Sequence, residues 1–118
     1  MADPNIQAAA ANLQKAASQK LYDQQQMKLN ADRLRRETEN KVNDLKRELH
    51  SQEANAATST DSAQRQRASQ ASRRIIQEVD KVKTDVKQQV QQMEQTAAQI
   101  TREAQDLQNL ARDLQMRA

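Results

Sequence analysis

Four arginines gather near the middle of the chain, in a stretch from 62 to 77 that contains no acidic residue. The four are Arg65, Arg67, Arg73 and Arg74. Guanidinium groups bind phosphates and carboxylates through paired hydrogen bonds. Arg67, Arg74 and Lys81 are seven residues apart, so on a helix they would line one edge. The stretch is therefore a candidate surface for an acidic partner, and nucleic acid is one such partner.

The alternative is that these arginines are solvated and form ion pairs with a neighbouring helix. Asp44, Glu48 and Glu53 are the acidic residues that an antiparallel arm would bring alongside. No aromatic residue is interleaved with the arginines for base stacking, and Tyr22, the single aromatic residue, is far along the chain. Both interpretations stay open at this point.

The chain holds few of the other residues that perform chemistry. It has no cysteine and no glycine, and its one histidine, His50, has Arg47 three residues before it and Glu53 three after it. Carboxylates are plentiful, but an acid and base pair needs a cleft that shifts their pKa values. We therefore predict a protein that is not an enzyme, with no catalytic, cofactor or metal site and no small-molecule substrate.

The composition predicts that helices carry these side chains. Among 118 residues there is no glycine, and Pro4 is the single proline. Turns that need positive φ are costly without glycine, so β-hairpins are nearly excluded. The abundant residues are alanine, glutamine, lysine, arginine, glutamate and leucine, which favour helices. The sequence thus predicts an all-α protein.

The first helix is expected over about 4–57. Asp3 can cap its first turn and Pro4 suits the first helical position. One stripe of the helix is apolar, with Lys20, Gln24 and Thr38 filling its gaps. Its apolar members are Ile6, Leu13, Ala17, Met27, Ala31, Leu34, Val42, Leu45 and Leu49. Between 31 and 56 the spacing includes steps of eleven residues, which leave a helix with little left-handed supercoil.

The second helix is expected over about 61–117 and has a more regular pattern. Its a positions recur every seven residues at Val79, Val86, Met93, Ile100, Leu107 and Leu114. The d positions are Ile75, Val82, Gln89, Thr96, Glu103 and Leu110, and apolar e positions follow at Ile76, Val90, Ala97, Ala104 and Ala111. An a/d/e face is broader than a two-stranded coiled coil needs, which indicates more than one neighbouring helix.

A turn is expected at about 57–61, where the only internal cluster of helix-capping residues occurs. Asp61 with Gln64 three residues later fits a capping box. The two arms are then equal in length and form one domain over 1–118, a long two-helix antiparallel coiled-coil hairpin. A single continuous helix in a parallel coiled coil is the alternative, since no glycine or proline forces the break.

The functional prediction is a structural or protein-interaction protein that associates with itself, as a homodimer or higher oligomer, into a four-helix bundle. Its expected self-association seam is Ile75, Val79, Val82, Val86, Met93, Ile100, Leu107, Leu110 and Leu114. Another helical protein is a second expected partner, and a nucleic-acid-associated protein using Arg65 to Arg74 is the alternative function. With neither a signal-peptide pattern nor a long apolar run, we expect a cytoplasmic protein without a membrane span.

Overall fold

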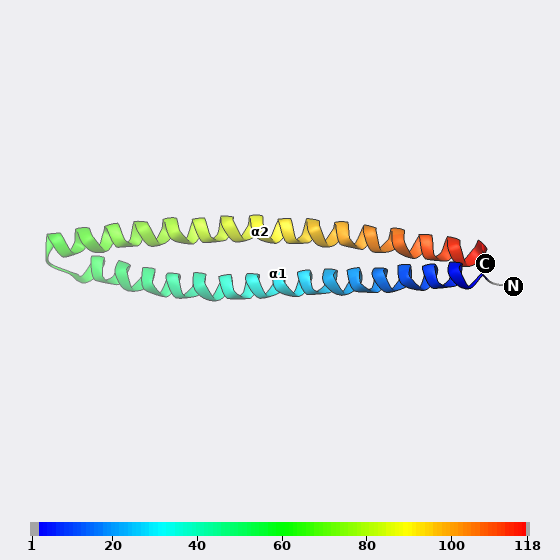
Figure 1. The fold of residues 1–118 in the computed structure, drawn as a ribbon. Coiled ribbons are helices and arrows are strands. Elements are labelled where there is room, and N and C mark those ends of the chain that lie inside the picture. The colour runs from blue at the N-terminus through cyan, green and yellow to red at the C-terminus, as the bar shows by residue number, and fades with distance from the viewer. Residues whose placement is uncertain (1–2, 118) are drawn as a thin grey trace. The chain divides into compact units, whose positions relative to one another are not determined.

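The structure, a computed structural model, describes residues 3–117 and folds them into two α-helices (Figure 1). Helix α1 is Pro4–Thr58, with 55 residues, and α2 is Ser62–Arg117, with 56 residues. No strand occurs within this range. The chain reverses between the helices, so the fold is the all-α helical hairpin and not the continuous rod. The domain expected over 1–118 also included residues 1, 2 and 118, which lie outside the described residues.

Helix α1 begins where the sequence placed it. The Asn5 amide donates to Asp3 Oδ1 at 2.9 Å, and the Gln7 amide donates to the Asp3 carbonyl at 3.0 Å. Pro4 is the first helical residue, a position at which its missing amide costs no hydrogen bond. The side chain of Asp3 thus satisfies an amide that the helix itself leaves unpaired.

Residues 59–61 form the turn and reverse the chain without a left-handed residue, since no described residue has a positive φ. Asp61 caps α2, with its Oδ1 accepting from the Ala63 amide at 2.9 Å. Gln64 does not complete the expected capping box. The Asp61 amide donates to Ser59 Oγ at 3.2 Å, and that hydroxyl donates to Gln64 Oε1 at 3.0 Å. The Ser59 hydroxyl therefore links the turn to the first turn of α2.

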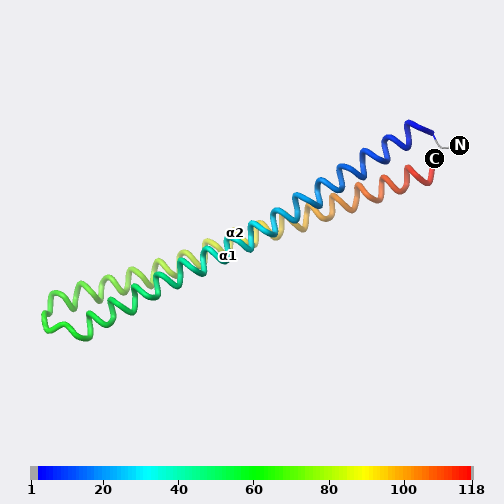
Figure 2. The backbone as a smooth tube through the Cα atoms, turned by 90° about the horizontal axis from the view of Figure 1, so that it is seen from below, coloured from blue at the N-terminus to red at the C-terminus, as the bar shows by residue number. Residues whose placement is uncertain are grey.

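The hairpin divides into two compact units, each built from a part of both helices. Unit 1 is Met1–Ala31 with Gln91–Ala118, and unit 2 is Asp32–Val90. In unit 1 the blue part of α1 runs beside the orange and red part of α2, and unit 2 contains the turn, drawn in green (Figure 2). Each unit is thus an antiparallel helix pair.

Unit 2 has a small aliphatic core. Val42, Ile75 and Val79 are buried together. Leu45, Leu49 and Val82 pack against them and are partly buried. Toward the turn, Ala68 is the buried residue of α2 and no large aliphatic residue accompanies it. The packing is therefore thickest in the middle of the unit and thin beside the turn.

Unit 1 has no such cluster, because every buried residue among its described residues is an alanine. The alanine seam of unit 1 consists of Ala10, Ala17 and Ala31 on α1 and Ala97, Ala104 and Ala111 on α2. Small side chains let two helix backbones approach closely. Some larger apolar residues of this unit lie beside the seam and are half-buried, while others, such as Leu29 and Leu110, are exposed.

The buried stripe of each helix contains one eleven-residue step, and both steps fall mainly in unit 2. On α1 the step runs from Ala31 to Val42, inside the range where the sequence predicted this spacing. On α2 it runs from Val79 to Val90, where the sequence analysis expected heptads alone. The a positions stay in the stripe throughout. Their neighbours change from d positions to e positions between Val82 and Val90, inside unit 2, which leaves Gln89 exposed.

Candidate interaction surfaces

One side of unit 1 carries a row of half-buried large side chains. This apolar face of unit 1 consists of Ile6, Leu13, Met27, Met93, Ile100, Leu107, Leu110 and Leu114. All but Leu110 are half-buried, and Leu110 is 53% exposed. On α2, Leu110 lies three residues from Leu107 and four from Leu114, so the three side chains share one helix face. The intramolecular packing covers this face only in part.

An ion pair shows that the two helices contribute to the same side. Lys20 Nζ lies 2.8 Å from Glu103 Oε2. Lys20 is seven residues from both Leu13 and Met27, and Glu103 is seven residues before Leu110. Residues seven apart share a face of a helix in a coiled coil, so the bond places the apolar rows of α1 and α2 side by side.

Glu103 is held as a carboxylate by both of its oxygens. Its Oε2 accepts from Lys20, and its Oε1 accepts from Gln99 Nε2 at 3.4 Å. These hydrogen bonds and the charge of Lys20 lower the pKa of Glu103 below the ordinary value of a glutamate. The carboxylate of Glu103 therefore stays charged at neutral pH in the middle of an apolar face.

The nine residues of the predicted self-association seam fall into three groups in the hairpin. Ile75 and Val79 are buried in unit 2. Leu110 is exposed. The others, which are Val82, Val86, Met93, Ile100, Leu107 and Leu114, are half-buried. Inside the hairpin the seam is thus completed by the alanine series at e positions, which the sequence analysis noted as widening the face but did not pair with alanines of the first arm.

The other side of unit 1 is polar. A groove of about 450 Å³ lies there, and the residues that line it are Gln24, Lys28, Glu94, Ala97, Ala98, Thr101 and Arg102. Lys28 and Glu94 flank the alanine seam and not the apolar row, because each is three residues before a seam alanine. The two sides of unit 1 therefore differ in chemistry.

The four arginines of the candidate basic stretch are all exposed in unit 2. Arg65, Arg67, Arg73 and Arg74 form no ion pair with any described residue. Two of the three acidic residues expected opposite them, Asp44 and Glu53, have their contacts along α1 instead. Asp44 lies 3.4 Å from Arg47, and Glu53 lies 3.9 Å from His50. Arg65 to Arg74 thus keep their charges available to a partner.

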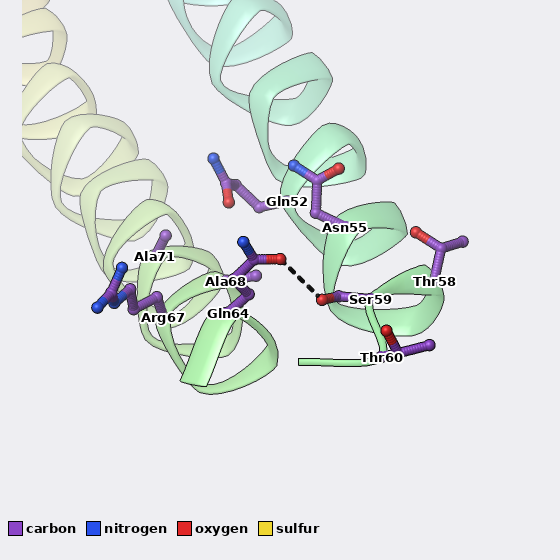
Figure 3. Close-up of a pocket in the computed structure, with 9 residues that line it drawn as sticks. All are labelled: Gln52, Asn55, Thr58, Ser59, Thr60, Gln64, Arg67, Ala68 and Ala71. Carbon is purple, nitrogen blue, oxygen red and sulfur yellow. Dashed lines mark hydrogen bonds between the residues drawn. The ribbon is translucent and has the colours of Figure 1, made fainter. Parts of the chain in front are cut away.

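A polar cleft of about 740 Å³ opens beside the turn in unit 2 (Figure 3). The lining residues are Gln52, Asn55, Thr58, Ser59, Thr60, Gln64, Arg67, Ala68 and Ala71. Arg67 is the one charged residue among them, while the others supply amides, hydroxyls and two alanines. The arginine stretch therefore reaches this cleft through Arg67.

Within the described range, 3–117, no group of three or more metal-ligating side chains occurs. No helix in the same range is both long and apolar enough to span a bilayer. His50 is exposed and contacts Glu53 alone among the described acidic residues. The most distinctive surfaces of the described residues are thus the apolar face of unit 1 and the arginines of unit 2.

Comparison with protein-family models, with curated proteins and with solved structures gives no match to this chain.

Proposed function

We propose that this chain is a non-enzymatic structural or interaction protein that associates with itself through the apolar face of unit 1. The observation that carries the proposal is that small residues fill the seam of unit 1 while large apolar residues lie outside it. Alanines fill the seam between α1 and α2, and Leu107, Leu110 and Leu114 are left beside it. A contiguous apolar patch of this kind on a helix pair is typical of a protein interface.

The exposed area supports an additional partner. The chain exposes 8850 Å² to solvent. A compact protein of 13.4 kDa exposes about 6500 Å², so this chain exposes about 2300 Å² more. A stable interface buries roughly 600–1000 Å² on each partner. The excess is large enough to accommodate such an interface, and the apolar face of unit 1 is where burial would be most favourable.

Sedimentation equilibrium at micromolar concentration tests the proposal. We expect a dimer or a larger oligomer, with a four-helix bundle formed where two copies of unit 1 meet. A folded monomer at all concentrations would contradict it. Circular dichroism in parallel establishes that the sample is helical, so that an unfolded chain is not counted as a monomer.

Two matched substitutions identify the face that is used. Leu110 is 53% exposed on the apolar face, and Leu29 is 52% exposed on α1. Leu29 is two residues from both Met27 and Ala31, which puts it on the outward side of α1. Leu110→Glu is expected to raise the dimer dissociation constant at least tenfold, whereas Leu29→Glu leaves it unchanged. The reverse result would place the interface on the outer side of α1.

A second candidate function is binding to nucleic acid through the arginine stretch. The observation in its favour is that Arg65, Arg67, Arg73 and Arg74 have no ion-pair partner among the described residues. Phosphates bind exposed guanidinium groups through charge-assisted hydrogen bonds, and binding would weaken as salt is raised.

Gel retardation at low salt tests this candidate. The double variant Arg67→Gln/Arg74→Gln should lose retardation, and its helicity and oligomeric state should stay unchanged. The matched control is Arg102→Gln/Arg112→Gln, which removes the same charge from unit 1. If the wild type is not retarded, or if both double variants lose binding equally, the arginine stretch is not a nucleic-acid site.

A further inference from the structure

The Lys20–Glu103 ion pair is an anomaly on the apolar face of unit 1. Along α1 it is preceded by Ile6 and Leu13 and followed by Met27, all on the same row. Lys20 and Glu103 keep 37% and 42% of their side-chain surface exposed. A partner that covers the apolar residues on both sides of the pair must also cover the pair.

Covering this pair with an apolar surface is costly. A charged pair loses its hydration when it is buried, and its mutual attraction repays that loss only when further hydrogen bonds and charges surround it. Glu103 already accepts from Lys20 and Gln99, while the ammonium of Lys20 donates to Glu103 alone among the described residues. Lys20 therefore has donors left for a second acceptor.

A second copy of this chain supplies that acceptor if the two-fold axis runs parallel to the helices, between the two apolar faces. In a two-fold interface, residue i contacts residue j and j contacts i. An axis in this direction sets α1 of each copy against α2 of the other at the same level, so each Lys20 lies beside the other copy's Glu103. An axis perpendicular to the helices would set α1 against α1, with Lys20 against Lys20 or against the partner's leucines or methionines.

We propose that a second copy docks on the apolar face of unit 1 with its two-fold axis parallel to the helices, so that Lys20 of each copy faces Glu103 of the other. The four charges form one layer in which each is flanked by opposite charges. The apolar residues before and after it supply the hydrophobic contact. The same layer fixes the register, because a slip along the helices would leave the charges unpaired. This inference rests on the self-association proposed above and specifies its geometry.

Mixing two charge-reversed variants tests the contact between copies. Lys20→Glu places two acidic groups at the layer, and Glu103→Lys places two basic groups there. Each variant alone should have a dimer dissociation constant at least tenfold higher than the wild type, since like charges then meet. Mixed in equal amounts, they restore opposite charges across the interface. We expect about nine-tenths of the dimers to be heterodimers, against about half for random exchange.

The readout is ion-exchange chromatography, which separates the three dimers because their net charges differ. The exchange is run in about 0.5 M salt, where attraction between distant charges is screened and contact pairs persist better. The double variant Lys20→Glu/Glu103→Lys serves as a folding control. It retains an ion pair within and between copies, and it should dimerise within about threefold of the wild type.

A second pair of variants controls for net charge. Lys28→Glu and Glu94→Lys make the same charge changes on the polar side of unit 1. Their mixture should exchange at random, with about half of the dimers mixed. Random exchange of the Lys20 and Glu103 variants, or an equal preference in the control pair, overturns the proposed register.

The two levels of the proposal fail in different ways. A wild type that is monomeric in sedimentation overturns both the self-association and the register. If the wild type is dimeric but Leu110→Glu does not weaken the dimer, the apolar face of unit 1 is not the interface. A dimeric wild type that responds to Leu110→Glu but shows no heterodimer preference overturns the register alone.

Discussion

Unit 1 and unit 2 are built from the same two helices but bury different kinds of side chain between them. Unit 2 buries Val42, Ile75 and Val79 in one cluster. Unit 1 buries alanines only, and Ala104 and Ala111 are fully covered. Burying an alanine removes far less apolar area from water than burying a valine or isoleucine. Unit 2 therefore carries more of its own stability, while unit 1 gains close helix contact and leaves its larger residues half-buried or exposed.

The strongest test of this contrast is to empty the core of unit 2. Ile75 is buried and its neighbour Ile76 is 47% exposed, so the pair is matched in chemistry and helix position. Ile75→Ala should lower the free energy of unfolding by about 2–3 kcal/mol, the low end for core truncations because the cluster is small. Urea unfolding followed by circular dichroism measures the change.

Ile76→Ala is the control for this experiment, and it should cost less than about 0.5 kcal/mol as a surface substitution. Equal losses at the two positions would mean that Ile76 is also covered, and that unit 2 has a second interface. That result would contradict the contrast between unit 2, whose aliphatic core is covered within the hairpin, and unit 1, whose large apolar side chains stay partly exposed.

The alanine seam of unit 1 gives the next largest effect. Ala104→Leu forces a large side chain into a position that is 0% exposed, and overpacking of this kind costs roughly 1–3 kcal/mol. Ala98→Leu, on the exposed side of the same helix, should be neutral. Thermal unfolding of both variants measures the difference. A neutral Ala104→Leu would show that α1 and α2 do not approach closely in unit 1.

Removing the N-terminal cap of α2 should lower the free energy of unfolding by a smaller amount, and the loss should be confined to unit 2. Asp61→Ala removes the acceptor of the Ala63 amide and should cost about 1 kcal/mol. Asp80→Ala, at an exposed position inside the same helix, is the control. Native-state hydrogen exchange should locate the loss at the start of α2. Faster exchange in unit 1 as well would mean that the two units unfold together.

The smallest effect is the pH dependence of the Lys20–Glu103 pair. Hydrogen bonds from Lys20 and Gln99 hold the pKa of Glu103 below its ordinary value. A carboxylate whose pKa is lower in the folded state adds stability above its unfolded pKa. That contribution is lost as the pH falls through the folded value. The stability of unit 1 should therefore drop on acidification.

Urea midpoints at about pH 6 and about pH 3 measure this drop. Glu103→Gln should make the wild-type decrease smaller, because the amide does not titrate. If Glu103→Gln leaves the pH profile of unfolding unchanged, the ion pair contributes nothing to the fold of unit 1.

The sequence was a good guide to the hairpin and a partial guide to its surfaces. The capping residues around Asp61 located the turn, and the stripe from Ile6 to Leu49 on α1 matches the residues that the structure buries or half-buries. These features were predictable because they depend on local preference and on periodicity along one helix. Ala10, a buried member of the same stripe, was overlooked because alanine occurs on every face.

The choice between the two edges of the α2 stripe was not predictable from α2 alone. Both d and e positions flank the a positions, and either could have faced α1. Which edge faces α1 depends on the sizes of the residues on both helices. Ala97, Ala104 and Ala111 are buried together with a row of α1 that contains Ala10 and Ala17. Alanines repeating every seven residues on both arms were the available signal. The role of Gln64 also depended on the turn geometry, which places Ser59 within reach.

The distance along the chain between Lys20 and Glu103 has a consequence for the order of folding. The two residues that form this pair are 83 positions apart, whereas the turn joins its helices through only three residues. Closing a long loop costs more entropy than closing a short one, so contacts close to the turn are the first to become favourable. During synthesis the first thirty residues of unit 1 emerge long before the α2 residues that pair with them. The alanines of the first arm must therefore wait until residues 97–111 have been made, and the apolar face of unit 1 forms after the contacts beside the turn.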